Sequence, residues 1–228
     1  MGNYYSIKAP IAANYGGFFK ANFTVNCPHQ LIIGFIMARL ILGSSSPFRK
    51  ALLEKLDLSF DTDSPDIDEA PLKGELPKDM VARLAKAKAQ AIAERHPQSI
   101  IIASDQCATL DGEIIGKPLT HENAVKQLQN ASGRAVTFYT SLCVFNAGTN
   151  QYQEVVEPFY VYFRELNDGQ IENYLQKEEP YKCAGSFKSE GLGISLFERL
   201  EGNDPNTLIG LPLIQLIIML EKNNIHVI

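Results

Sequence analysis

Residues 134–165, RAVTFYTSLCVFNAGTNQYQEVVEPFYVYFRE, decide the fold class of this sequence. Two long runs rich in β-branched and aromatic residues, 134–146 and 153–165, flank the Gly-Thr-Asn at 148–150. Such runs favour strands, and a short link that contains glycine is typical of an antiparallel pair. We therefore expect two long antiparallel strands in a sheet.

Shorter strands are expected upstream of this pair. The β-branched run 99–103 predicts a central strand. The Asp-Gly pair at 111–112 stands between two strand-like triplets, 108–110 and 113–115, and predicts a tight hairpin because Asp-Gly favours its two-residue turn. Residues 39–42 predict one more short, buried strand.

Five helices are expected around these strands. Several have a clear start signal, such as Ser46 before Pro47, Thr120 as an N-cap, or the turn at Gly210. The expected helices span 47–57, 78–95, 120–130, 167–176 and 211–222. Residues 61–76, acidic with two prolines and a glycine, are expected to form a loop. Because strands and helices mix without a strict β–α–β alternation, we expect an α/β fold with a mixed, elongated sheet flanked by helices.

The composition is that of an ordinary globular protein of 228 residues, 45% hydrophobic and 21% charged. The formal net charge of −5 argues against a protein that coats a nucleic acid polymer, because contacts with phosphate backbones need a basic surface. The four cysteines form no C-x-x-C pair, and the four histidines do not cluster with them. We therefore expect neither a zinc site nor a disulfide framework, and we expect a reduced, cytoplasmic protein.

Residues 1–36 differ from the rest of the chain. They contain no Asp or Glu and only two lysines as basic residues. Their apolar run, 31–36, is far shorter than the roughly 20 residues of a membrane span. We expect either a loosely ordered N-terminal extension or translated sequence upstream of the natural start, which we place at Met37. Residues 37–228 are assigned to one domain.

The strongest local feature for chemistry is the stretch 43–50, Gly-Ser-Ser-Ser-Pro-Phe-Arg-Lys. A strand leads through small residues into a helix N-terminus, where free backbone N–H groups and the helix dipole bind anions. The hydroxyls of Ser44 and Ser46 and the guanidinium of Arg49 would add donors suited to phosphate. The pattern is not a Walker loop. The alternative is plain capping of the helix by Ser46, with Arg49 in solvent.

Acidic residues form a second candidate feature. Asp68 and Glu69 stand in the expected loop, and Asp105 follows the strand-like run 99–104. Carboxylates at loop and strand ends can hold Mg²⁺, which prefers oxygen ligands and bridges to substrate phosphates. Asp68 and Glu69 could instead be solvated loop charges, and Asp105 could be a capping or turn residue.

Two lysines and a late glycine-rich stretch complete the candidates. Lys88 lies on the expected long helix, where lysines are usually solvated. Lys117 precedes Pro118, which restricts the residue before it to extended geometry. Glu190 lies in the stretch 183–193, whose glycines would let backbone approach a flat ligand closely. The alternative for this stretch is an ordinary surface loop.

Taken together, these motifs resemble those of the Maf-like nucleotide pyrophosphatases. The resemblance covers the chain from about Met37 to its end. The matching stretches are 44–49, 68–69, 83–89, Asp105, 116–118, 132–133 and 210–212. Several ordered motifs at the right intervals are difficult to obtain by chance.

The resemblance implies a fold of the Maf and inosine-triphosphatase type. It also implies an enzyme that cuts nucleoside triphosphates between the α- and β-phosphates, with a divalent metal, Mg²⁺ or Mn²⁺, and usually as a homodimer. The phosphates would be held by Ser44, Ser46, Arg49, Lys88 and Lys117. The metal would be surrounded by Asp68, Glu69 and Asp105. Asp105 would be the proton acceptor for the attacking water, either as a general base or by positioning the water through the metal.

Three positions divide the family by base, and here they are Phe48, Gln106 and Glu190. They differ from the Arg, Thr and Gln expected in the branch that cleaves dTTP and UTP, and they resemble the branch that acts on 7-methyl-GTP. Methylation at N7 makes guanine cationic, so the carboxylate of Glu190 would favour it, and Phe48 could stack on its ring. Guanine also presents N1–H and N2–H donors that one carboxylate can accept.

Two other functions remain open at the level of sequence. The nearer one is the same hydrolysis acting on dTTP or UTP. The farther one is a non-catalytic nucleotide-binding regulator, for example of septum formation, which would not need the metal carboxylates. In each case we expect a nucleotide as the partner, with no nucleic acid polymer and no membrane.

Overall fold

The computed structural model describes residues 39–228, and the expected extension 1–36 and the start at Met37 lie outside the described residues. A seven-stranded sheet has the order β2-β1-β3-β5-β6-β7, with β4 paired to β3. Its strands are β1 (Leu40–Gly43), β2 (Asp61–Asp63), β3 (Ile100–Leu110), β4 (Glu113–Ile115), β5 (Ala135–Asn146), β6 (Gln151–Phe163) and β7 (Phe197–Glu201). β1 is parallel to β2 and β3, whereas all other pairs are antiparallel, so the expected mixed sheet is confirmed.

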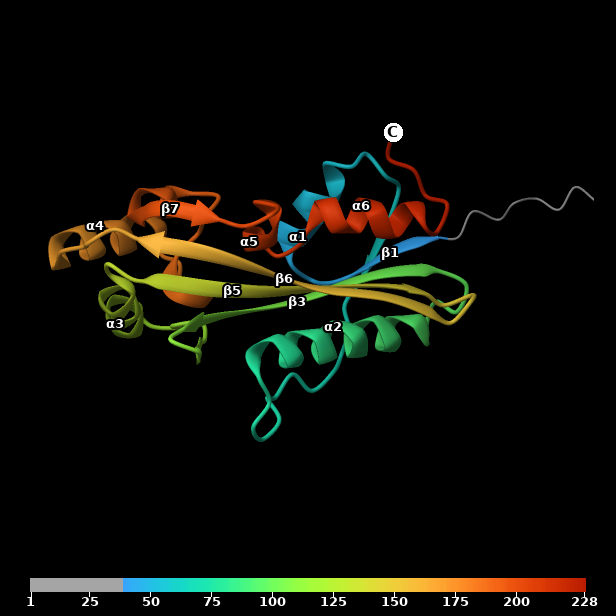
Figure 1. The fold of residues 1–228 in the computed structure, drawn as a ribbon, viewed down its shortest axis with the longest axis horizontal. Helices are drawn as coiled ribbons and strands as arrows, with labels where there is room; N and C mark the ends of the chain where they lie inside the picture. Colours follow the sequence, from blue (N-terminus) through green and yellow to red (C-terminus); the bar gives the residue numbers. More distant parts are fainter. Residues whose placement is uncertain (1–38) are drawn as a thin grey trace, which may run out of the picture. The chain divides into compact units, whose positions relative to one another are not determined.

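Helices lie on both faces of this sheet, as expected (Figure 1). They are α1 (Pro47–Glu54), α2 (Pro77–Ala93), α3 (His121–Ala131), α4 (Asp168–Glu178), α5 (Asn206–Ile209) and α6 (Leu213–Glu221), with short 3₁₀ turns η1 (Ala184–Ser186) and η2 (Leu192–Leu196). Figure 1 shows α2 along one face and α1, α5 and α6 across the other, while α3, α4 and β7 gather at the far end of the long strands.

The predicted starts of α1, α3 and α4 are confirmed by the caps that the structure contains, whereas α6 begins at Leu213, two residues after its expected start, and Gly210 instead caps the end of α5. The Oγ of Ser46 accepts a hydrogen bond from the backbone N–H of Arg49, with Pro47 at the first helical position. Thr120 caps α3 in the same way, and Asn167 caps α4 with a reciprocal bond to Gln170. Each cap satisfies a backbone N–H that has no partner inside its helix.

Three expectations about the strands were incomplete. The expected loop 61–76 contains β2, three residues that pair with β1. The strand expected to end before Asp105 continues to Leu110, so Asp105 lies inside β3 and not at its end. The edge strand β7 was not expected. β2 and most of β7 are exposed and therefore lack the apolar signal on which strand prediction depends.

Buried side chains form separate clusters on the two faces and at the two ends of the sheet. One cluster fills the space between the sheet and α1 and α6, and contains Leu42, Leu142 and Leu216. Another packs α2 against β3 and β5. A third, rich in phenylalanine, packs α3, α4 and the segment around Phe187 at the far end. β5 contributes to all three, so the long strands connect them.

Candidate active site

A gap in the strand pairing of β3 sets the position of the candidate site. On one side, β3 pairs with β1 only over Ile100–Ile102 and with β4 only over Ala108–Leu110. On its other side, β3 pairs with β5 along its whole length. Residues 103–107 therefore have no strand partner on the first side within the part of the chain that the structure describes. We call this stretch the open edge of β3.

Along the open edge, backbone groups of β3 have no strand partner, and side chains alternate between the two faces of the sheet. The N–H of Ile100 points toward β1, where it donates to the carbonyl of Arg39. Because backbone direction alternates along a strand, Ser104 and Gln106 also direct their N–H and C=O groups to this side. Successive side chains point to opposite faces. Asp105 thus faces α2, whereas Ser104 and Gln106 face α5.

The loop before α1 follows β1 directly and lies at one end of the open edge. The backbone N–H of Ser46 donates to the Oγ of Ser44 at 3.1 Å, and this fixes the loop. Arg49 is not in solvent: its Nε donates to the carbonyl of Gly210 at 2.9 Å, and the Oγ of Ser104 donates to the same carbonyl at 2.8 Å. The structure thus brings Ser44, Ser46 and Arg49 together beside the open edge.

Gly210 is required at this junction for two reasons. Its φ of +120° lies in a region that residues with a side chain rarely adopt. A Cβ at this position would also lie 3.3 Å from the Nε of Arg49. The motif residue at 210 therefore lets α5 approach α1 and fix the guanidinium, a role that its late position in the sequence did not reveal.

Lys88 of α2 pairs with two of the predicted metal carboxylates. Its Nζ lies 2.6 Å from the Oδ1 of Asp105 and 2.8 Å from the Oε1 of Glu69. Lys88 is only 6% exposed, so it is not the solvated helical lysine of the alternative interpretation. A buried ion pair is stable only when the attraction between its charges offsets their loss of hydration. Removal of one partner leaves an uncompensated buried charge and destabilises the fold.

The electrostatics couple this ion pair to Arg49 across the open edge. Burial raises the pKa of Asp105 above its ordinary 3.8, while Lys88 and Arg49 act in the opposite direction and lower it. Burial lowers the pKa of Arg49, and the charges of Asp105 and Glu69 raise it. A carboxyl with a raised pKa inside a cationic setting is typical of a catalytic acid or base.

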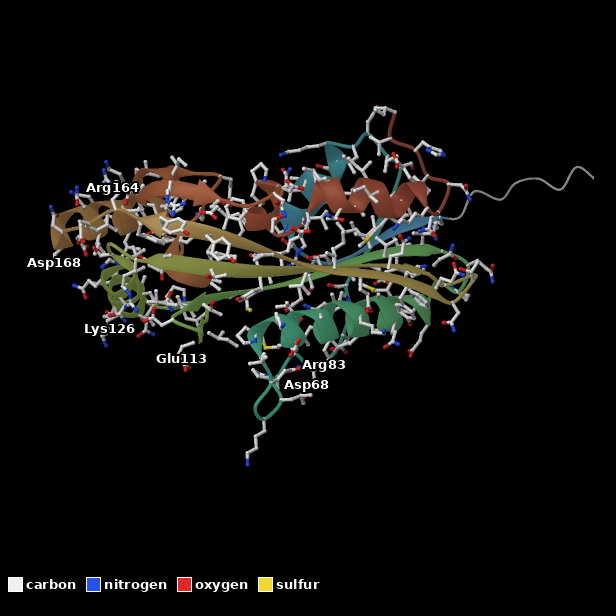
Figure 2. All side chains as sticks on the ribbon, in the orientation of Figure 1. Asp68, Arg83, Glu113, Lys126, Arg164 and Asp168 are labelled. Atoms are coloured by element: carbon white, nitrogen blue, oxygen red, sulfur yellow. The ribbon has the colours of Figure 1, made fainter. Side chains whose placement is uncertain are left out.

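The loop that carries Asp68 and Glu69 is held against α2 by Arg83. The guanidinium of Arg83 binds both carboxylate oxygens of Glu75, at 2.6 and 2.7 Å, and donates to the carbonyl of Ala70 at 3.1 Å. Asp68 accepts the backbone N–H of Ala70 at 2.9 Å and lies close to Arg83 (Figure 2). Asp68 therefore organises its own loop, and Glu69 alone reaches Lys88.

The carboxylate oxygens of Glu69 and Asp105 are the type of ligand that a hard divalent cation prefers. Both carboxylates place an oxygen within 2.8 Å of one positive charge, the ammonium of Lys88. Mg²⁺ prefers such oxygen ligands and keeps water or substrate phosphate in its other positions. Within residues 39–228, no group of three or more His, Cys, Asp or Glu side chains forms a ready cation site.

Lys117 and Glu190 both lie near Cys183. Both act electrostatically on the thiol of Cys183, where burial and Glu190 raise the pKa and Lys117 lowers it. Glu190 accepts a hydrogen bond from the Oγ of Ser189 at 3.2 Å. Lys117 follows β4 closely, since β4 ends at Ile115. No hydrogen bond or ion pair of the described residues links Lys117 or Glu190 to Asp105.

The three predicted specificity residues come from three separate segments. Phe48 is 40% exposed on α1, Glu190 is exposed in the loop between η1 and η2, and Gln106 lies on β3 beneath α5. No hydrogen bond among residues 39–228 joins any two of them. The structure therefore does not bring them into direct polar contact.

Sequence interpretation missed the polar residues that support the site from β5. The Oγ of Ser141 accepts from the N–H of Asp105 at 3.1 Å and donates to the carbonyl of Val81 at 2.6 Å. Thr140 bonds Gln106 and the carbonyl of Thr207. The available signal was this Thr-Ser pair in the middle of a largely apolar strand, because buried hydroxyls need partners.

Comparison with known proteins gives one family and one similar relative. A family profile described as "Maf-like protein" matches residues 39–223. A curated protein of Aliivibrio fischeri named "7-methyl-GTP pyrophosphatase" is 57% identical over 193 residues, which is 85% of this chain and 100% of the relative.

Two solved structures are also similar. A Vibrio cholerae protein has a TM-score of 0.44 and 10% identity, over 83% of this chain and 99% of its own. A HAM1 protein from Coxiella burnetii has a TM-score of 0.44 and 15% identity, over 82% of this chain and 100% of its own.

Proposed function

The chain belongs to the Maf-like protein family, and from this membership we propose that it hydrolyses 7-methyl-GTP to 7-methyl-GMP and pyrophosphate. The observation that carries the proposal is the buried contact of Lys88 with Asp105 on the open edge of β3, 2.6 Å long. It supplies a carboxylate for proton transfer next to cations that suit a triphosphate. The relative named as a 7-methyl-GTP pyrophosphatase supports the same reaction.

The phosphates would lie between the two sources of positive charge. Ser44, Ser46 and Arg49 would bind them from the α1 side, while Lys88 and Lys117 would neutralise charge from the α2 and β4 sides. Arg49 is already fixed on the carbonyl of Gly210, so its remaining donors need little reorganisation to bind a phosphate.

Asp105 would accept the proton of the attacking water. The water oxygen attacks the α-phosphorus, the bond from this phosphorus to the bridging oxygen breaks, and pyrophosphate leaves with that oxygen. Burial raises the pKa of Asp105, which makes the carboxylate a stronger base than an exposed aspartate. Ser141 holds the backbone of Asp105 and so fixes the base against the substrate.

A divalent cation, Mg²⁺ or Mn²⁺, would be held by Glu69 and Asp105, with Asp68 nearby in the same loop. When bound, it supplies charge neutralisation to the triphosphate. Lys88 would then be free to turn from the carboxylates to the phosphates. Its long, flexible side chain permits this movement.

Base preference would follow from Phe48, Gln106 and Glu190. The carboxylate of Glu190 favours a base that carries the positive charge of N7-methylation, and the exposed ring of Phe48 is available to stack on it. An Arg in place of Phe48 would instead repel this base.

The remaining expectations about the protein's setting form part of the same proposal. We propose a cytoplasmic homodimer, because the dispersed cysteines suit a reducing compartment and the family usually dimerises. Within residues 39–228, no helix is long and apolar enough to cross a membrane.

The test is pyrophosphate release by the purified chain with Mg²⁺, Mn²⁺ or EDTA. The nucleotides are 7-methyl-GTP, GTP, dTTP, UTP, CTP and ATP. We expect metal-dependent release with a strong preference for 7-methyl-GTP. Asp105→Asn should lower kcat by about 100-fold or more, because a positioned general base contributes about 10²–10⁴.

The matched control is Asp168→Asn on α4, at the far end of the sheet (Figure 2). It removes a carboxylate outside the site and should leave kcat unchanged. Preference for dTTP and UTP would keep the enzyme class and overturn the proposed substrate. A folded chain that binds these nucleotides without any release would favour the non-catalytic regulator instead.

A further inference from the structure

The side-chain amide of Gln106 is oriented by three oxygen atoms. Its Nε2 lies 2.8 Å from the Oγ1 of Thr140, 2.9 Å from the carbonyl oxygen of Thr207 and 3.1 Å from that of Leu208. Carbonyl oxygens only accept hydrogen bonds, so the NH₂ end of the amide must face them. The opposite end, Oε1, has no hydrogen-bond partner among residues 39–228.

Thr140 links the parts of this arrangement. It is fully buried, and it stands directly opposite Gln106 in the pairing of β3 with β5. Its hydroxyl donates to the carbonyl of Thr207 at 2.9 Å and is therefore left to accept from Gln106. One hydroxyl thus ties β3, β5 and the short helix α5 together.

The consequence is that Gln106 presents only an acceptor at the open edge. A free glutamine can rotate its amide to offer either a donor or an acceptor to a ligand. Rotation here would turn Oε1 toward two carbonyl oxygens and leave buried polar groups unpaired, which is costly. The site is therefore built for a base that offers an N–H group at this point.

We propose that Thr140 is a positioning residue for base recognition. Its hydroxyl holds the side chain of Gln106 so that the Oε1 of Gln106 faces the substrate. This inference rests on the proposed function, in which Gln106 faces the base. The matching substrate chemistry is a base with an imino or amino donor on its edge, as in 7-methylguanine.

The kinetic test is a double-mutant cycle between Thr140 and Gln106 in the full chain. Thr140→Val keeps the shape of the side chain and removes its hydroxyl. We expect it to lower kcat/KM for 7-methyl-GTP about fivefold, through a higher KM with kcat retained. Thr140→Ser keeps the hydroxyl and should restore kcat/KM to within twofold of the original protein.

The cycle separates positioning from general support of the fold. In a Gln106→Ala background, Thr140→Val should cause no further change in kcat/KM, because the amide on which it acts is gone. An equal loss in both backgrounds would overturn the proposal, as would an unchanged KM in the single Thr140→Val variant.

A second measurement does not depend on turnover. Nuclear magnetic resonance of the unsubstituted chain, with the Gln106 amide assigned by its absence in Gln106→Ala, reports the solvent exchange of the Nε2 protons. We expect exchange at least tenfold slower than for an exposed glutamine, and faster exchange in Thr140→Val. Exchange as fast as that of an exposed glutamine would overturn the proposal. Absence of 7-methyl-GTP turnover with slow exchange would count against the proposed function and leave only the hold of Thr140 on the Gln106 amide supported.

Discussion

At the scale of single residues, the site depends on how Asp105 combines burial with nearby positive charge. The carboxylate lies inside a strand and contacts the ammonium of Lys88 at 2.6 Å. Burial favours its neutral form, and the cations favour its charged form. The result is a pKa above the ordinary 3.8 of an aspartate.

This balance predicts the acid limb of the pH–rate profile. A general base works only when ionised, so kcat/KM should fall about tenfold per pH unit as the pH drops below the pKa of Asp105. The midpoint should lie above 3.8, because kcat/KM reports the free enzyme and burial raises this pKa in the metal-free protein. The measurement is kcat/KM against pH, with circular dichroism at each pH to show that the protein remains folded. A midpoint below 3.8 would contradict the prediction.

Glu190 should set the preference for a cationic base. Glu190→Gln keeps the size of the side chain and removes its charge. We expect the ratio of kcat/KM for 7-methyl-GTP over GTP to fall about tenfold, or about 1.4 kcal/mol, as for one partly screened charge pair. Glu113→Gln, on the exposed hairpin strand β4, is the matched control and should leave the ratio unchanged. An unchanged ratio in Glu190→Gln would remove Glu190 from base recognition.

The residue types in the site were predictable, but several of their partners were not. Sequence indicated Arg49, Lys88 and Asp105 as candidates because their chemistry suits phosphate and water. It could not show that Lys88 bonds Asp105, since this contact joins residues 17 positions apart on a helix and a strand. It also could not show that Asp68 turns to its own loop, because that choice depends on local backbone geometry.

At the scale of elements, the short strand β2 is attached to the end of α2 by one carboxylate. Asp63 lies 2.8 Å from the Nε of Arg95 and 2.9 Å from the Nε2 of His96. The hydrogen bond from Arg95 lowers the pKa of Asp63 to about 2, against the opposing effect of burial, with a further contribution from His96.

This pairing predicts a pH-dependent contribution to stability. A carboxyl whose pKa is lower in the folded state stabilises the fold above its unfolded pKa of 3.8, and this contribution is lost as the pH falls toward 2. Asp63→Asn should reduce the free energy of unfolding by about 1 kcal/mol at pH 7. The difference from the original protein should disappear near pH 2.

Urea unfolding of both proteins at the two pH values measures this difference. Asp61→Asn, on the same strand but in a more exposed pair with Arg39, is the control and should have a smaller effect. A difference between Asp63→Asn and the original protein that stays constant from pH 7 to pH 2 would contradict the assignment.

Long elements with a clear pattern were predicted well, and short exposed ones were not. The strand pair β5 and β6 and the helix α2 follow from runs of more than ten residues. β3 was expected to be shorter because Ser104, Asp105 and Gln106 are polar. Those residues interrupt the apolar pattern, and strand pairing with β5 overrides their weak propensity.

At the scale of the described domain, three of the four clusters of buried side chains are joined by the same long strands. Phe138 belongs to the cluster at the α3 and α4 end, and Leu142 belongs to the cluster beneath α1 and α6. Both stand on β5, four positions apart. Loss of either cluster therefore disturbs a strand on which the other depends.

Because the clusters share strand β5, we predict one cooperative unfolding transition for residues 39–228. Leu142→Ala and Phe138→Ala should each lower the free energy of unfolding by about 2–5 kcal/mol, the usual cost of deleting a large buried side chain. In both variants, far-ultraviolet circular dichroism and tyrosine fluorescence should give coincident midpoints. Two separated transitions in either variant would show that the ends of the sheet unfold independently.

The placement of Phe48, Gln106 and Glu190 on three segments without mutual hydrogen bonds affects how the protein can evolve. Substitutions at sites that do not contact one another in the protein usually add in their effects on stability. Phe48 and Glu190 are exposed, so either can change without disturbing the core. A duplicated gene could therefore change its preferred base one substitution at a time, through intermediates that all fold. Gln106 is the exception, because a new residue there must also satisfy Thr140 and the α5 carbonyls, and this position should be the slowest to diverge.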